Sequence, residues 1–182
     1  PRFPWRVAVM LRSRDENSVR QPSGNCSPDF GAAPGNGVAR VPDMVAAGMN
    51  VTLGHDCFFT LDTAEYIRYA SLVHKAHRAN PAILPIFQVL DMATGNAARA
   101  LGMGDRIGSL TEGKRADILV IRPDSPSPVV PASVLSWFSM SFQGRNVETV
   151  LVDGKVVVKG GRVTTVDEEK VAAACVAEAR AL

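Results

Sequence analysis

Several features that mark other classes of protein are scarce in this chain of 182 residues. No apolar run approaches the roughly 20 residues that a membrane-spanning helix needs. Neither sign of charge is in excess, because 20 Lys and Arg residues stand against 18 Asp and Glu residues. The composition therefore indicates neither a membrane protein nor one that binds nucleic acid. A complete (β/α)8 barrel takes about 250 residues, so the chain is also too short to hold one.

Cysteine is scarce as well. Cys26, Cys57 and Cys175 are odd in number, widely spaced and contain no CxxC pair, so they form no disulfide framework. We expect reduced thiols and a cytoplasmic location. The apolar stretch from Val7 to Leu11 is closed by Arg12, which makes it too short for the core of a signal peptide.

What the chain does have is the composition of a folded globular protein, with 46% hydrophobic and 21% charged residues. Residues 1–40 differ from the rest. Pro, Ser, Asn and Gly dominate residues 21–37, and no period of 2 or 3.6 persists there. We expect residues 1–40 to be irregular or disordered, and ordered structure to begin near Val41.

Residues 41–105 predict an αβ unit followed by helices. A short helix starts at Pro42 and ends at Gly48, and a β-rich run, Met49 to Leu53, follows it. Apolar residues on both faces of this run predict a buried strand of a parallel sheet. Asp62 or Thr63 begins a long helix that ends at Asn80-Pro81. Its predicted apolar stripe is Tyr66, Tyr69, Ala70, Val73 and Ala76. Two shorter helices are expected after it, one from near Pro85 that buries Ile86, Val89 and Leu90, and one over residues 96–101.

Residues 106–182 read as strands, turns and a final helix. Residues 116–121 predict a strand, and a Pro-rich linker separates it from a short helix over residues 132–138. Asp153-Gly154, between two β-branched runs, is a strong hairpin signal. Asp167 is expected to cap a helix over residues 168–181.

One concentrated chemical feature, Gly54-His55-Asp56-Cys57, follows the predicted buried strand. Parallel α/β proteins place active sites at the C-terminal ends of such strands. Asp56 could bind a metal ion or move a proton there, and its alternative role is to cap the next turn. His55 points to the opposite face if strand geometry persists. Cys57 would need a paired histidine to act as a nucleophile, and the sequence identifies none.

His74 and His77 form a second candidate, because residues at i and i+3 are neighbours on one helix face and such a pair can bind Zn²⁺. No carboxylate or thiolate stands out as a third ligand, and the surrounding sequence HKAHR is strongly basic. The alternative is a solvated helix end, which the local charge favours.

From about Asn25 onward, four stretches together resemble one known family in order and spacing. They are residues 45–56 (VAAGMNVTLGHD), 92–102 (MATGNAARALG), 107–121 (IGSLTEGKRADILVI) and 147–158 (VETVLVDGKVVV). The chain resembles the amidohydrolase superfamily, in particular the branch that includes cytosine deaminase, S-adenosylhomocysteine-type deaminases and atrazine chlorohydrolase.

The resemblance implies a fold and a chemistry. The fold class would be α/β. Residues 41–105 would be the last βα units of a (β/α)8 metal-dependent hydrolase barrel, and residues 106–182 a small β-sandwich segment with a C-terminal helix. The activity would be hydrolysis of a C–N bond in a small heterocyclic substrate. Asp56 would be the catalytic residue and a ligand of a divalent metal, Zn²⁺ or Fe²⁺, and His55 would contact the substrate.

The chain also departs from the family pattern. Its three histidines include no His-x-His pair, and Asn25-Cys26-Ser27-Pro28 carries Asn where the family usually has His. A hydrolytic zinc site uses about three protein ligands, so we expect this chain alone to bind no metal and to be inactive. One alternative is a split hydrolase, in which a complementary chain or a homo-oligomer supplies the missing strands. The other is a non-catalytic relic or interaction domain.

Overall fold

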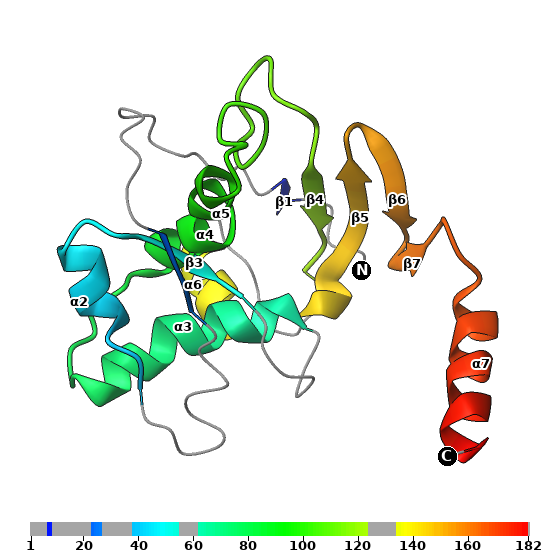
Figure 1. The fold of residues 1–182 in the computed structure, drawn as a ribbon, viewed down its shortest axis with the longest axis horizontal. Coiled ribbons are helices and arrows are strands. Elements are labelled where there is room, and N and C mark those ends of the chain that lie inside the picture. The colour runs from blue at the N-terminus through cyan, green and yellow to red at the C-terminus, as the bar shows by residue number, and fades with distance from the viewer. Residues whose placement is uncertain (1–6, 9–22, 27–37, 55–61, 124–133, 182) are drawn as a thin grey trace.

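The computed structural model describes residues 7–8, 23–26, 38–54, 62–123 and 134–181 (Figure 1). Helices α2–α6 gather around a short two-stranded sheet, and a five-stranded sheet lies beside them. The elements are β1 (Val7–Ala8), β2 (Ser23–Cys26), α2 (Val41–Ala46), β3 (Asn50–Leu53), α3 (Thr63–His77), α4 (Ile86–Ala93), α5 (Gly95–Ala100), β4 (Ile118–Ile121), α6 (Val134–Met140), a 3-10 turn η2 (Gly144–Asn146), β5 (Val147–Val152), β6 (Lys155–Lys159), β7 (Arg162–Val163) and α7 (Glu168–Ala181). None of the helices in these ranges is long and apolar enough to cross a membrane.

Strand β3 pairs in parallel with β2, with Ser23 opposite Asn50 and Cys26 opposite Leu53. The predicted parallel pairing of this strand is confirmed. Both β2 and β1, however, lie within residues 1–40, where the sequence predicts irregular structure, and that prediction is wrong for these two short stretches. Ser-Gly-Asn-Cys has little intrinsic β-propensity. It becomes a strand because the polar backbone of buried β3 needs a hydrogen-bonded neighbour.

The apolar core lies between β3 and helices α3, α4 and α6. Val51, Val89 and Met92 are almost completely buried in it, together with the aromatic side chains of α6. Helix α3 turns a different face inward from the predicted stripe. Its buried residues are Ala64, Tyr66, Ile67, Ala70, Ser71 and His74, whereas Tyr69 and Ala76 are exposed. Packing against α4 and α6 sets this face, and the two tyrosines do not share it.

Two asparagines join β3 to α5 across the core. The Asn50 side-chain amide donates to the Asn96 carbonyl oxygen at 3.0 Å, and the Asn96 amide donates to the Val51 carbonyl oxygen at 2.8 Å. Buried polar groups are costly unless they are paired, and each amide here finds a backbone acceptor on the other element. The strand is thereby fixed to the helix by direction-dependent bonds as well as by apolar contact.

The five-stranded sheet has the order β1-β4-β5-β6-β7, and all its neighbours are antiparallel. The predicted hairpin is confirmed, because Asp153 and Gly154 both have positive φ, at 51° and 76°, between β5 and β6. Positive φ at both turn positions matches the right-handed twist of the flanking strands. The second sheet that a β-sandwich requires is not among the described residues.

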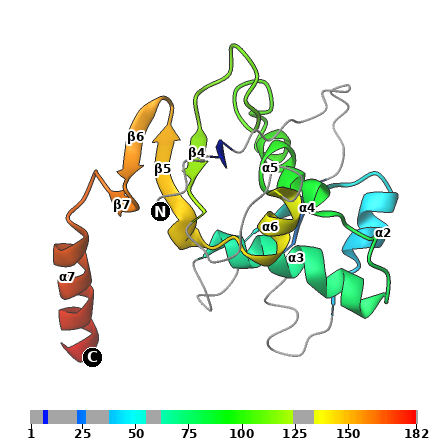
Figure 2. The same ribbon diagram turned by 180° about the vertical axis from the view of Figure 1, so that it is seen from behind.

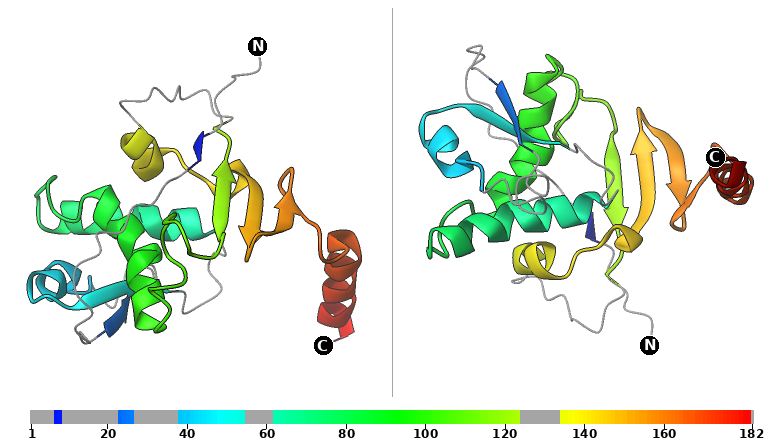
Figure 3. Two further views of the ribbon diagram at one scale, coloured as in Figure 1. Left: turned by 90° about the horizontal axis from the view of Figure 1, so that it is seen from above. Right: turned by 60° about the horizontal axis from the view of Figure 1, so that its bottom comes forward.

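Helix α7 begins and ends as predicted, and it stands apart from the rest of the fold at the far side of β7 (Figure 2). Both views in Figure 3 show the same separation. From Glu169 to Arg180 every residue is exposed. Its contact with the sheet runs through Glu168, whose carboxylate accepts a hydrogen bond from the backbone of Val163.

Gly108 marks the tightest packing of the loop after α5. Its φ is +88°, and a Cβ at this position would lie 2.6 Å from the Ala98 Cβ and 3.1 Å from the Thr94 carbonyl oxygen. Gly113 has a similar φ of +87° but nothing within 4 Å of such a Cβ. The two glycines therefore separate the cost of backbone strain from the cost of a steric clash.

We predict that Gly108→Ala lowers the free energy of unfolding by about 1–3 kcal/mol more than Gly113→Ala does. Both variants pay about 1–2 kcal/mol for a left-handed backbone, and only the first also overpacks the core. Urea unfolding of the two variants and the parent chain measures the difference. Equal losses of the free energy of unfolding would show that a Cβ at position 108 does not clash with Thr94 and Ala98.

Candidate functional site

The predicted site begins where β3 ends. Asn50, Val51 and Thr52 are buried, and Gly54 is the last described residue of this stretch. The three candidates that follow, His55, Asp56 and Cys57, lie outside the described residues, so their roles remain predictions. The structure does establish that the strand leading to Asp56 is buried, parallel and anchored to α5.

The far end of the same connection is anchored by Asp62, the N-cap of α3. One carboxylate oxygen, Oδ1, accepts from the Ala64 backbone N–H at 2.9 Å, and the other, Oδ2, accepts from the Gly144 N–H at 2.9 Å. A Cβ on Gly144 would lie 2.8 Å from Asp62 Oδ1, so a larger residue there would displace this carboxylate. Asp62 was predicted only as a helix cap. Its second role joins the start of α3 to the turn between α6 and β5.

The histidine pair on α3 is divided between the core and the solvent. His74 is only 2% exposed, whereas His77 is exposed. The prediction of a solvated helix end is therefore wrong for His74. Burial lowers the pKa of His74 below its ordinary value of 6.5, and the nearby positive charges of His77, Arg78 and Lys75 lower that pKa further. A neutral imidazole fits this position.

A metal centre does not assemble within the described residues. No group of three or more His, Cys, Asp or Glu side chains lies close enough in that part of the chain to hold a metal ion. His74 and His77 thus have no third ligand there. Any catalytic metal needs ligands from outside the described ranges.

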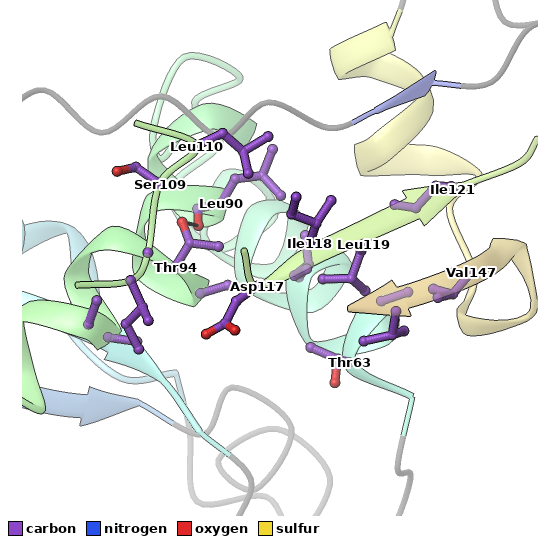
Figure 4. Close-up of a pocket in the computed structure, with 18 of the residues that line it drawn as sticks. Thr63, Leu90, Thr94, Ser109, Leu110, Asp117, Ile118, Leu119, Ile121 and Val147 are labelled. Carbon is purple, nitrogen blue, oxygen red and sulfur yellow. Dashed lines mark hydrogen bonds between the residues drawn. The ribbon is translucent and has the colours of Figure 1, made fainter. Parts of the chain in front are cut away.

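A cleft of about 860 Å³ lies between the helices and the five-stranded sheet (Figure 4). Helices α3, α4, α5 and α6 form one side, β4 and β5 form the other, and the loop of residues 107–110 closes one end. Apolar side chains dominate it, and Ile118, Leu119 and Leu110 are among those drawn in Figure 4. This cleft was not predicted from the sequence, because its walls come from segments far apart in the chain.

The comparisons with known proteins agree on one family. Residues 9–157 match the model of the amidohydrolase family, and the chain belongs to this family. It is 44% identical over 140 residues to a 5-methylthioadenosine/S-adenosylhomocysteine deaminase of Desulforudis audaxviator, a match that covers 75% of this chain and 32% of the relative. The chain therefore spans about a third of the length of that relative.

Solved structures give the same result. An adenosine deaminase from Xanthomonas campestris with bound zinc superimposes with a TM-score of 0.78 at 28% identity, over 87% of this chain and 36% of that one. Atrazine chlorohydrolase from Arthrobacter aurescens, complexed with zinc, gives a TM-score of 0.70 at 27% identity, over 86% and 35%. The resemblance to the deaminase and chlorohydrolase branch is confirmed. The chain has part of the mixed α/β fold of the amidohydrolases.

We predict that acid destabilises the chain through His74. Because the pKa of His74 is lowered in the folded state, the unfolded chain takes up the proton first as the pH falls below about 6.5. The free energy of unfolding should therefore be unaffected by this group above that pH and should fall on acidification below it.

Denaturant unfolding of the parent chain, His74→Gln and His77→Gln between pH 5 and pH 8 measures this effect. The His74 variant should lose part of the acid-dependent slope, since glutamine stays neutral. His77→Gln is the matched control, because His77 lies one turn away and is exposed. Identical slopes in all three proteins would contradict the assignment.

We predict that Asp62→Ala lowers the free energy of unfolding by about 1–3 kcal/mol, because it removes a helix cap and leaves the Gly144 N–H without its acceptor. Thermal or urea unfolding measures the loss. Asp167→Ala is the control, since Asp167 also caps a helix, accepting from the Lys170 backbone N–H at 3.1 Å. Helix α7 is exposed, so this second change should leave the main transition in place. A similar shift in both variants would contradict the prediction.

Proposed function

We propose that this chain is the C-terminal part of a metal-dependent amidohydrolase that hydrolytically removes an amino group from a small heterocyclic substrate of the adenosine type. In this proposal residues 41–105 complete a (β/α)8 barrel and residues 106–182 contribute strands and a helix to a small β-sandwich domain. The activity belongs to the complete fold, of which this chain is about a third. The complete enzyme is proposed to act in the cytoplasm.

The observation that carries the proposal is the placement of β3. It is a buried strand in a parallel pairing, and the residue three positions beyond its last one is Asp56. A rigid strand end is where a barrel enzyme holds a reacting side chain. Because β3 is fixed by Asn96 and α3 is fixed by Asp62, both ends of the connection that carries Asp56 are anchored. The deaminase names of the relatives support the substrate class.

The proposed chemistry is hydrolysis of a C–N bond. Water supplies the oxygen of the new C–O bond, and the nitrogen leaves as ammonia with a proton that has to be delivered to it. The Asp56 carboxylate is the group that would take a proton from the attacking water and give one to the leaving nitrogen. His55, the residue before Asp56 in the sequence, would contact the substrate.

A divalent metal, Zn²⁺ or Fe²⁺, is proposed for the complete enzyme, with Asp56 as one of its ligands. The zinc-bound relatives support this assignment. No group of three or more possible ligands lies together among the described residues, and we propose that the remaining ligands come from the other two thirds of the fold. This chain alone is therefore proposed to bind no catalytic metal and to be inactive.

A chimaera tests the proposal. Residues 38–182 replace the matching segment of the Desulforudis relative, ammonia release is measured with 5-methylthioadenosine and S-adenosylhomocysteine, and chloride release is measured with atrazine. We predict metal-dependent deamination of an adenosine-type substrate, and a loss of about 10²-fold or more in kcat for Asp56→Asn, since a general acid–base group contributes about that much.

The matched control for this experiment is Asp105→Asn, which changes an exposed aspartate outside the proposed site. It should leave kcat unchanged. Full activity of the Asp56→Asn chimaera would remove Asp56 from the chemistry. A folded chimaera that binds metal but turns over none of the substrates would favour the alternative, a non-catalytic relic.

A further inference from the structure

The cleft between the helices and the sheet carries a concentration of exposed apolar side chains. Leu101 is 71% exposed, Leu119 is 47% exposed and Val152 is 49% exposed, and Leu110 is the fourth large apolar residue at the same cleft. They come from α5, the following loop, β4 and β5. Single exposed apolar residues are ordinary, but a contiguous group on the walls of one cleft marks a surface that another structure covers.

The floor of the cleft is well formed. Ile121, Phe138 and Phe142 line it and are almost fully buried, and the two phenylalanine rings pack with their centroids 4.9 Å apart. Figure 4 draws Ile118, Leu119 and Ile121 of β4, all of which line the cleft. A rigid apolar floor with exposed apolar walls has the character of an interface core, in which apolar side chains of a partner pack at interior density.

Four polar side chains of the cleft, those of Asp62, Thr94, Ser109 and Asp117, are already hydrogen-bonded within the chain. Asp62 bonds the Gly144 backbone, Thr94 donates to the Leu90 carbonyl oxygen at 2.8 Å, and Asp117 accepts from the Asp153 N–H at 2.7 Å. The Ser109 and Thr111 hydroxyls are 2.9 Å apart and bond each other. A small-molecule site needs placed polar groups to orient its ligand, and here such groups are engaged elsewhere. The cleft therefore favours an apolar polypeptide surface.

We propose that this cleft is the docking surface for the polypeptide that supplies the rest of the amidohydrolase fold. The inference rests on the proposed function, and it adds the surface and the kind of partner. This chain covers 32% of its Desulforudis relative, and the superposed third of the Xanthomonas structure has a TM-score of 0.78. The matched third thus keeps its fold, and in both relatives about two thirds of the chain lies outside the matched segment.

Association of two polypeptides tests the inference. The full 182-residue chain is co-expressed with a tagged polypeptide that comprises the part of the Desulforudis relative outside the match. We expect a complex with one copy of each, measured by size-exclusion chromatography with light scattering, and its dissociation constant is then measured by titration calorimetry. Leu119→Asp and Leu101→Asp should each weaken association by about tenfold or more, as a change at an interface core does.

Val171→Asp is the matched control, because Val171 is 51% exposed on α7 and lies outside the cleft. It should leave the dissociation constant unchanged. Circular dichroism and the unfolding midpoint check that each variant folds, and the high exposure of the changed side chains favours folding. If Leu119→Asp does not fold, Leu101→Asp, at the more exposed position, still decides the outcome.

Several results would overturn the inference. The first is that the two polypeptides do not associate. The second is that they associate but the two cleft variants leave the dissociation constant unchanged. The third is that the chain alone dimerises and the same variants abolish the dimer. Uptake of the apolar dye ANS into the cleft that the partner polypeptide does not displace also counts against it. A complex that forms through the cleft but holds no metal and releases no ammonia would contradict the proposed function and leave the docking surface standing. An active covalent chimaera whose separate pieces do not associate would support the proposed function and contradict the docking surface.

Discussion

Burial of β3 with its polar groups satisfied is the constraint on which the rest of this fold depends. The strand lies against α4 and α5, where an unpaired amide or carbonyl group would cost about 1–3 kcal/mol. The Asn50 amide donates to the Asn96 carbonyl oxygen, the Asn96 amide donates to the Val51 carbonyl oxygen, and β2 satisfies the backbone on one edge. Because the strand cannot shift without breaking these bonds, the position of its C-terminal end is fixed relative to α5. The Asp62 carboxylate fixes the point at which the chain returns.

Local signals in the sequence were enough to predict much of the fold. The Asp153-Gly154 turn and helix α7 are set by neighbouring residues, so their residues alone revealed them. Strand β2 shows the limit of such reasoning, because Ser-Gly-Asn-Cys is extended only through pairing with a strand 27 positions along the chain, from Ser23 to Asn50. The buried face of α3 escaped prediction for a related reason. Apolar spacing fits more than one face of this helix, and its neighbours decide between them.

The candidate site divides in the same way. Asp56 could be singled out from a strand followed by an acidic residue, which is a local pattern, and its role remains a proposal. His74 was assigned to the solvent because Lys75, His77 and Arg78 surround it in sequence, but in the folded chain His74 is one of the buried residues of α3, whereas His77 and Arg78 are exposed. The apolar cleft was not predicted from the sequence, since α5, β4 and β5 meet only in the folded chain. Family membership, in contrast, could be inferred from the sequence. It rests on four stretches that are each continuous in the chain, and their order and spacing match the family.

The separation of α7 from the sheet divides the chain into two thermodynamic units. A helix of 14 residues is marginal in water unless it packs against something, and from Glu169 to Arg180 this one is exposed on all sides. Its helicity therefore depends on its own alanines and end charges, and it melts gradually with temperature while the core unfolds cooperatively. Cys175, the free thiol of this helix, is exposed. A spectroscopic label attached there would report fraying of the terminus without disturbing the apolar core.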